Sequence, residues 1–336
     1  MTTMQINKSE KWGGQRGFIT VATGSKKYYR VAANLLKSYR YFTKNPLPFA
    51  ILADEENEYT DLFDDVIILK NPSYSYLDKI HLLNNLPYKE TLFVESDCLA
   101  YGDLNEYFEG FIDCGDFAVF GTNYELEHQF KNEWGWFEPQ KLGKYSSLVK
   151  FIPRFGSTFM YMREGEICKK MYDICLDIWN HAGEYGFLPL DDQLLAVALA
   201  VVDCRCVHSG RKYDCCVYPF YKEHKWKPRP QMHKGVLSYV RPDYGRVEEC
   251  LICHWGNYLT TKNLYKREVF SLNCLINNKK FIMKCGVVFY DFLRPFSNFA
   301  MYLEKILKMI YGCILENRKL RKMFYPLEKM IKVIKN

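Results

Sequence analysis

The sequence lacks the glycine-rich motifs that bind phosphate in two large groups of nucleotide-binding proteins. Neither G-x-G-x-x-G nor G-x-x-x-x-G-K-[ST] occurs in its 336 residues. Their absence argues against a dinucleotide-binding domain and against a P-loop NTPase. Any nucleotide bound by this chain is therefore expected to be held by other means.

Long apolar segments are also missing from both ends of the chain. Residues 1–14 are polar and charged, with no apolar stretch of the signal-peptide type. Near the C-terminus, residues 295–303 run for only nine positions without a charge, well short of the ~20 that a transmembrane helix needs. We therefore expect a cytoplasmic protein whose thirteen cysteines stay reduced.

Apolar and aromatic residues are plentiful and support a sizeable core. They make up 48% and 16% of the chain, respectively. The length is long for one domain and short for two large ones. We expect a polar N-terminal tail at 1–15, an α/β domain at 16–270 and a helical, basic segment at 271–336.

The net charge of +7 is concentrated in the last part of the chain. Residues 303–336 contain nine Lys/Arg and three Glu, which leaves the rest almost neutral and gives no reason to expect a nucleic-acid partner. Apolar residues interleave with these basic residues, as in helices that lie on a membrane surface. At about 1 kcal/mol per basic residue, this segment is expected to bind an anionic membrane peripherally. The alternative is a solvated pair of helices packed on the body.

Several cysteines lie close together in sequence. Such spacing can indicate a zinc site. Most of these cysteines, however, lie in apolar, strand-like surroundings where small buried thiols are ordinary. The residues concerned are Cys204, Cys206, Cys215, Cys216, Cys250 and Cys253, with His254 next to the last. We favour the buried-thiol interpretation.

Short apolar runs alternate with helical patterns through the first half of the chain. Strands are expected at 17–23, 48–53 and 65–69, and again around 92–94 and 117–121. Helices are expected after residue 25 and at 76–86. This alternation predicts a mostly parallel sheet with helices on its faces.

The central stretch is an apolar run that ends in two carboxylates. Leu92, Phe93 and Val94 resemble a strand buried on both faces, and Glu95 and Asp97 follow it. Strand alternation would aim both carboxylates to one side, at the edge where open α/β sheets bind ligands. Two hard oxygen ligands there suit Mg²⁺ or Mn²⁺ with a diphosphate. An acidic turn at the strand end is the simpler alternative.

The second half continues with less regular patterns. Residues 123–154 are polar and aromatic-rich, as in active-site lids, and 155–162 resume as a strand. Helices are expected at 164–181 and 191–201, the second with Asp191 and Asp192 as capping residues. A basic loop at 219–245 precedes a short strand at 251–257.

Five pieces of the sequence, taken in order, resemble glycosyltransferase family 8, which has the GT-A fold. The first is Ala22-Thr23-Gly24 with Tyr28 after it, and the second is Lys79, sixteen residues before Glu95. The third is the segment from Leu92 through Glu95-Ser-Asp97 to Gly102-Asp103-Leu104, similar to the family's D-x-D region. The last two are Asp192-Gln193 and His254-Trp-Gly256. The resemblance extends over residues 17–262.

This resemblance implies a function and a site. The function is transfer of a sugar from a UDP-sugar to a saccharide or glycolipid acceptor, with retention of configuration. The implied metal ligands for Mn²⁺ (or Mg²⁺) are Glu95, Asp97 and His254, the imidazole favouring Mn²⁺. The implied donor-binding residues are Ala22, Thr23, Tyr28 (stacking on uracil), Lys79, Ser96 and Gly256. Asp54 is added from its position at the end of the second strand, where it could accept a hydrogen bond from a base or ribose or could equally be a turn residue. Asp192 and Gln193 are expected beside the transferred sugar.

Three positions depart from the family pattern. Glu95 replaces the first Asp of D-x-D, Thr158 stands where a Gly is usual, and the histidine motif is one residue shorter, with Lys262 a loose match to the lysine after it. These departures keep a second interpretation open, a catalytically impaired sugar-nucleotide-binding or scaffold protein. A sugar-nucleotide pyrophosphorylase is a third, although Gly24-Ser-Lys-Lys is a poor version of its phosphate loop.

Overall fold

The structure is a computed structural model of the whole chain. It describes residues 15–127, 137–185, 190–207, 216–217, 229–241, 245–247, 250–256, 260 and 262–291. The chain divides into two compact units, residues 1–260 and 261–336. The expected boundary at residue 270 falls inside a helix of the second unit.

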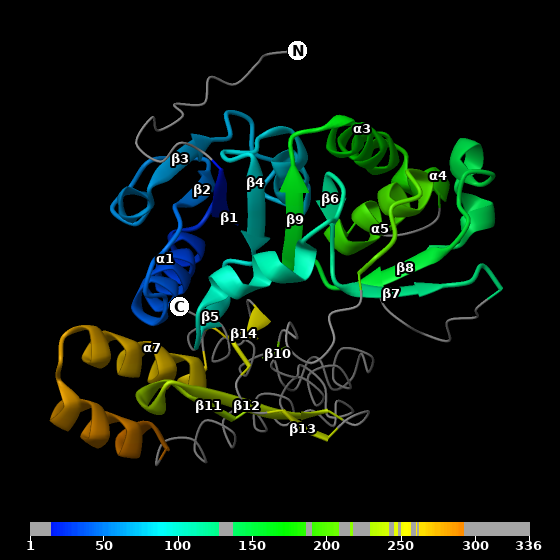
Figure 1. Ribbon diagram of the computed structural model, residues 1–336. Coiled ribbons are helices and arrows are strands. Elements are labelled where there is room, and N and C mark those ends of the chain that lie inside the picture. The colour runs from blue at the N-terminus through cyan, green and yellow to red at the C-terminus, as the bar shows by residue number, and fades with distance from the viewer. Residues whose placement is uncertain are drawn as a thin grey trace, which may run out of the picture. The chain divides into compact units, whose positions relative to one another are not determined.

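The first unit is built on a six-stranded sheet with the order β3-β2-β1-β4-β9-β6 (Figure 1). Its strands are β1 (Arg16–Ala22), β2 (Phe49–Ala53), β3 (Asp65–Ile68), β4 (Glu90–Val94), β6 (Phe117–Ala118) and β9 (Phe159–Arg163). The first four are parallel, and β9 is antiparallel to β4 and to β6. The predicted α/β class with a mostly parallel central sheet is thus confirmed.

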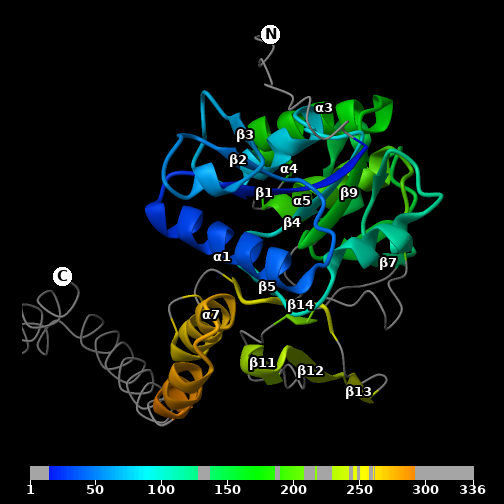
Figure 2. The same cartoon turned by 60° about the vertical axis from the view of Figure 1, so that its left-hand side comes forward.

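Helices cover both faces of this sheet (Figures 1 and 2). They are α1 (Lys26–Phe42), α2 (Leu77–Ile80), α3 (Glu166–Asn180), α4 (Ala182–Tyr185) and α5 (Asp191–Val201). Helix α1 begins at Ser25, whose hydroxyl accepts from Lys27 N, and packs on one face with Phe18 and Leu92. Helices α3 and α5 pack on the other face with Ile19 and Phe93. Alternate residues of β1 and β4 therefore serve two separate cores.

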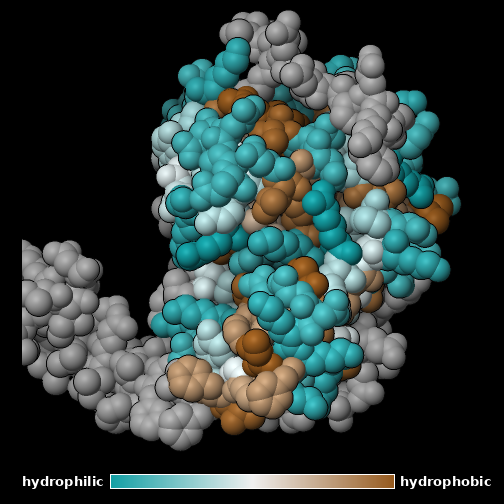
Figure 3. Space-filling view, turned by 90° about the vertical axis from the view of Figure 1, so that its left-hand side faces the viewer, coloured by the Kyte–Doolittle hydropathy of each residue, from teal (hydrophilic) through white to brown (hydrophobic). Residues whose placement is uncertain are grey.

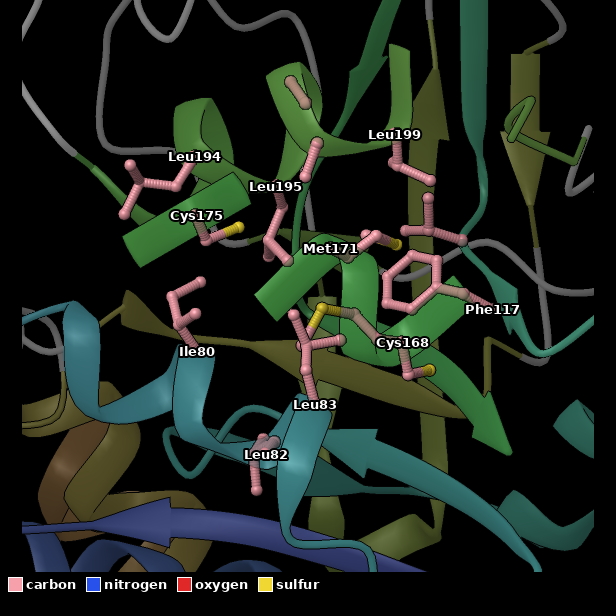
Figure 4. Packing of buried hydrophobic residues seen from close by; sticks show 14 of the residues in the cluster. Ile80, Leu82, Leu83, Phe117, Cys168, Met171, Cys175, Leu194, Leu195 and Leu199 are labelled. Carbon is pink, nitrogen blue, oxygen red and sulfur yellow. The ribbon is translucent and has the colours of Figure 1, made fainter. Parts of the chain in front are cut away.

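The core between α3, α5 and the sheet is filled by aliphatic and sulfur-containing side chains (Figure 4). Helix α5 is apolar almost all round, as expected for a helix buried on every side. The packed residues include Ile80, Leu83, Met171, Cys175, Leu194, Leu195 and Leu199. This packing fixes the start of α5 next to the end of β4.

Three smaller sheets complete the first unit. One has the order β10-β14-β5, another the order β11-β12-β13, and the third pairs β7 with β8. Their strands are β5 (Cys98–Ala100), β7 (Gly121–Tyr124), β8 (Ile152–Phe155), β10 (Cys216–Val217), β11 (Arg229–Gln231), β12 (Val236–Arg241), β13 (Gly245–Val247) and β14 (Ile252–His254). The pairing of β14 with β5 places His254 opposite Cys98, directly after the central strand.

Short 3₁₀ helices connect several of these elements. They are η2 (Thr60–Leu62), η3 (His81–Asn84), η4 (Leu104–Phe111), η5 (Pro139–Lys141), η6 (Gly143–Tyr145) and η7 (Met232–Lys234). The helix expected at 76–86 is therefore α2 followed by η3.

The structure corrects three of the expected elements. The strand expected at 155–162 is broken at residues 156–158 into β8 and β9, and the strand expected at 117–121 is divided between β6 and β7. The loop expected at 219–245 contains β11, β12 and the start of β13. The sequences of these segments do not alternate strictly between apolar and polar residues, which is the pattern that indicates a half-buried strand. Part of the expected lid, residues 128–136, lies outside the described residues.

The second unit begins with α7 (Asn263–Ile276), followed by helical residues 280–291. Apolar side chains gather on the face of this unit turned to the viewer in Figure 3. Two apolar residues of this unit are strongly exposed, Phe281 at 80% and Val288 at 69%. Of the helices that can be described, none combines the length and apolarity needed to cross a membrane. The basic segment at 303–336 lies outside the described residues.

Candidate functional site

The turn after β4 carries the two central carboxylates. Strand β4 ends at Val94, Glu95 N donates to Thr158 O at 3.0 Å, and Cys98 N donates to Glu95 O at 3.2 Å. Glu95 and Asp97 thus lie in a turn, not in a strand, and strand alternation does not aim them to one side. Both lie at the predicted edge of the sheet, but each contacts different partners.

Lys79 of α2 connects the Glu95 carboxylate with a second acidic residue. Its Nζ forms ion pairs with Glu95 Oε2 and Asp191 Oδ2 and donates to Ser157 Oγ at 3.0 Å. The Lys79 side chain is only 10% exposed. Burial alone would lower the pKa of Lys79, but the carboxylates of Glu95, Asp191 and Asp192 raise it well above its usual value. Lys79 therefore remains charged.

Asp191 and Asp192 occupy the first turn of α5, and neither caps the helix. The N-cap residue is Leu190, without a side-chain capping bond, so the predicted capping role is wrong. Asp191 Oδ2 accepts from Ser157 Oγ at 2.9 Å, and Asp192 Oδ1 accepts from Ser157 N at 2.9 Å. The pair is held by the turn between β8 and β9, close to the positive end of the α5 dipole.

Asp97 and His254 form the second half of the site. His254 Nε2 lies 2.9 Å from Asp97 Oδ1, yet that buried oxygen accepts no hydrogen bond of regular geometry from the described residues. On the other side of the ring, His254 Nδ1 lies 3.3 Å from Thr158 Oγ1. Burial favours the neutral acid, but the proximity of His254 holds the pKa of Asp97 below its usual value. Thr158, the residue that departs from the family pattern, therefore fixes the orientation of the imidazole.

The charges in this cluster do not balance. Four buried or half-buried carboxylates (Glu95, Asp97, Asp191 and Asp192) interact with one buried lysine, Lys79, while His254 and the more exposed Lys27 interact with Asp97. Burial and the neighbouring carboxylates raise the pKa of Glu95 and of Asp192 above their usual values. Surplus buried negative charge of this kind favours either proton uptake or the binding of a cation.

The donor set fits a divalent cation in part. Asp97 Oδ1 and His254 Nε2 present an oxygen and a nitrogen 2.9 Å apart, and Thr158 supports the imidazole. Glu95 Oε2 is bound by Lys79. Within the described part of the chain, no three His, Cys, Asp or Glu side chains form a metal-binding group by themselves. A cation here would therefore need oxygens from its ligand as well, which is the usual arrangement for Mg²⁺ and Mn²⁺ with phosphates.

The other expected donor-binding residues lie around the ends of β1 and β2. Thr23 Oγ1 donates to Asp78 Oδ2 at 2.7 Å, and Asp54 Oδ1 accepts from Gly24 N at 3.0 Å and from the Tyr29 hydroxyl. Both polar groups are thus used inside the protein. Tyr28 is 36% exposed.

The other residues that were expected to bind the donor or lie beside the sugar are mostly buried. Ala22 is 2%, Ser96 8% and Gln193 6% exposed, and Gly256 follows β14 with a φ of +65°. Gln193 follows Asp192 in the first turn of α5. The role of Ser157 was not predicted, because its partners Lys79 and Asp191 lie 78 and 34 positions away along the chain. Asp78 was not predicted either, and one of its partners, Thr23, lies 55 positions away.

The cysteines behave as structural thiols. Cys204 Sγ donates to Phe117 O at 3.2 Å and Cys250 Sγ to Ile252 O at 3.3 Å. Burial raises the pKa of Cys204 to about 11, which keeps it protonated. Among the residues that the structure describes, no three His, Cys, Asp or Glu side chains form a metal-binding group. The side chains of Cys215 and Cys216 lie outside the described residues.

Sequence comparisons do not place the chain in a family. No protein-family model matches it, and no curated protein matches it significantly. Among solved structures it is similar to several glycosyltransferases.

Three of these structures illustrate the similarity. The bifunctional glycosyltransferase WbbM shares 9% identity over 61% of this chain and 40% of its own, with a TM-score of 0.40. Mouse xyloside xylosyltransferase 1 shares 11% identity over 73% of this chain and 99% of its own (TM-score 0.45). The galactosyltransferase LgtC, in complex with donor and acceptor sugar analogues, shares 10% identity over 72% of this chain and 87% of its own, with a TM-score of 0.45. The chain thus spans less than half the length of WbbM. It also spans less than half of the glycosyltransferase GlyE from Streptococcus pneumoniae TIGR4, of which it covers 46%.

Proposed function

We propose that this protein is a metal-dependent glycosyltransferase of the family 8 type, which moves a sugar from a UDP-sugar to a saccharide or glycolipid acceptor. The observation that carries the proposal is the surplus of buried carboxylates at the carboxyl edge of the sheet, next to one buried lysine. A site with this charge suits a divalent cation that brings an anionic diphosphate with it. Open α/β sheets bind nucleotides at this edge.

In this proposal Asp97 and His254 hold Mn²⁺ (or Mg²⁺), and Glu95 belongs to the same set. Lys79 binds Oε2 of Glu95, which leaves its second oxygen for the ion. When bound, the ion would neutralise charge that develops on the departing diphosphate. The nitrogen of His254 favours Mn²⁺ over Mg²⁺.

The chain's own residues then orient the donor. Lys79, fixed by Glu95 and Asp191, provides a permanent positive charge in the site. Asp192 and Gln193 at the start of α5 are assigned to the sugar, which they orient. Retention of configuration is part of the proposal and follows the family resemblance.

A panel of UDP-sugars incubated with Mn²⁺ and read out as UDP release tests this function. Transfer or slow hydrolysis of at least one donor is the expected result. Exchange of pyrophosphate into a sugar nucleotide would instead identify a pyrophosphorylase. The absence of both reactions would favour the scaffold interpretation and contradict the proposal.

An anionic membrane surface is the second partner that we propose, with the protein cytoplasmic and peripheral. Helical residues 280–291 expose apolar side chains, among them Phe281 and Phe289, and two lysines, Lys280 and Lys284, near their start. Deleting residues 303–336 removes six surplus positive charges and should abolish binding to phosphatidylserine vesicles at low salt. Co-sedimentation checks this, with neutral vesicles as the control. Unchanged binding of the shortened chain to anionic vesicles would refute the assignment.

A further inference from the structure

Tyr74 lies in the connection between β3 and α2 and has a backbone conformation that is unusual for its residue type. Its φ is +53°, in the left-handed region where a bulky side chain is a genuine outlier. Such conformations are retained mainly where they contribute to function. The side chain is nevertheless 65% exposed, so burial in the core does not explain it.

The backbone at this position is fixed by the buried carboxylate of Asp78. Asp78 is 1% exposed. It accepts from Ser73 N and Ser73 Oγ, both at 2.7 Å, and from Tyr74 N at 3.1 Å. It also accepts from Thr23 Oγ1 at 2.7 Å. Asp78 therefore ties the connection directly to the end of β1.

The tyrosine ring lies against the glycine that follows β1. A Cβ atom placed on Gly24 would be 2.7 Å from Tyr74 Cδ1 and 3.4 Å from Cε1, so only glycine allows the ring to approach this closely. Gly24 N in turn donates to Asp54 Oδ1 at the end of β2. One part of the ring is thus covered by Gly24, and most of the remainder faces solvent at the edge where a nucleotide would bind.

We infer that Tyr74 is the stacking platform for the base of the bound nucleotide, an inference that rests on the proposed function. Thr23 Oγ1 and Asp54 Oδ1 are already hydrogen-bonded within the protein, so at the ends of β1 and β2 the exposed ring of Tyr74 offers a flat face on which a base can lie. An aromatic ring binds any base through its π-face. Tyr28, the residue expected from the sequence, is less exposed at 36%, and Lys27 Nζ lies 5.9 Å from its ring centroid.

The variant Tyr74→Asn tests this role, because asparagine tolerates the left-handed conformation and removes the ring. With Mn²⁺ present, its affinity for UDP measured by calorimetry should fall about tenfold or more, while its melting temperature stays the same or rises. Tyr74→Phe keeps the ring and should bind UDP like the wild type. Tyr76→Asn is the matched control, because Tyr76 is 57% exposed in the same connection, and it should leave the affinity unchanged.

Two other sets of results would refute the stacking role or the proposed function, respectively. Wild-type affinity in Tyr74→Asn, or equal losses in Tyr74→Phe and Tyr74→Asn, would refute the stacking role alone. Failure of the wild-type protein to bind UDP would refute the proposed function and, with it, this inference.

Discussion

Replacing Asp97 by asparagine is expected to reduce sugar transfer by about three orders of magnitude, because loss of metal-based charge stabilisation costs several kcal/mol. The substitution removes a negative charge next to His254 Nε2 and nearly preserves the shape of the side chain. Because the substitution also removes the ion pair with His254, the denaturation midpoint of the variant is measured alongside its activity. UDP release at saturating donor and Mn²⁺ measures the effect.

Asp61→Asn is the matched control for this experiment. Asp61 is exposed in η2, away from the site residues in sequence, and its substitution should change neither activity nor the denaturation midpoint. Wild-type activity of Asp97→Asn in the presence of a chelator would show that Glu95 and Asp97 are only an acidic turn at the end of β4.

Replacing Lys79 by methionine is expected to lower the free energy of unfolding by about 3–5 kcal/mol. Methionine replaces the apolar part of the lysine side chain but removes its ammonium group, which contacts both Glu95 and Asp191. Asp191 would keep its hydrogen bond from Ser157, but both carboxylates would lose this cationic partner, which is the costly case for a buried ion pair. Urea denaturation at pH 7 measures the loss.

The pH dependence of this loss distinguishes a charge effect from a packing effect. In the wild type, burial opposes ionisation of Asp191, but Lys79 lowers the pKa of Asp191 below its usual value. The ionised Asp191 therefore stabilises the fold fully at pH values above its unfolded pKa of about 3.9. This stabilisation is lost as the pH falls through the lowered pKa of the folded protein. Without Lys79 the same carboxyl should take up a proton readily. The difference in the free energy of unfolding between Lys79→Met and the wild type should therefore become smaller as the pH falls towards 4.

Two further variants control for local disruption. Lys26→Met removes an ion pair with Glu58 whose side chains are 71% and 62% exposed, and it should have no measurable effect. Adding Glu95→Gln and Asp191→Asn to Lys79→Met should recover much of the stability, because no buried charge is left unpaired. A loss that is independent of pH and is not recovered would contradict the electrostatic explanation.

The architecture could be predicted because its signals are local. The apolar runs that became β1, β2 and β4 are buried almost completely, and the helical spacing after Ser25 corresponds to α1. The misplaced elements include β8, β9, β11 and β12, which have three to six residues each, and also β6 and β7, which divide a single expected strand. Pairing partners define such short strands more than their own sequences do.

The site was predictable as a set of residues but not as a set of contacts. The resemblance selected Lys79, Glu95, Asp97, Asp192 and His254, yet nothing in the sequence indicates that Lys79 contacts Asp191, which is 112 positions away. The placement of His254 depends on the pairing of two three-residue strands, β5 and β14.

The left-handed backbone conformation of Tyr74 could not be predicted from the sequence either. A left-handed turn residue is usually Gly, Asn or Asp, so the Ser-Tyr-Ser sequence around Tyr74 gives no sign of it. The backbone is held by hydrogen bonds from Ser73 N and Tyr74 N to Asp78, and Asp78 in turn accepts from Thr23, which is 55 positions away.

The most direct test of the central claim is a calorimetric titration of the wild-type protein with UDP, first with Mn²⁺ and then with EDTA in its place. The account predicts that UDP binds at one site in Mn²⁺, more weakly in Mg²⁺, and at least about a hundredfold more weakly in EDTA, because the surplus carboxylates then repel the diphosphate. Equally tight binding of UDP in EDTA would contradict the claim that this cluster of carboxylates is a metal-dependent nucleotide site.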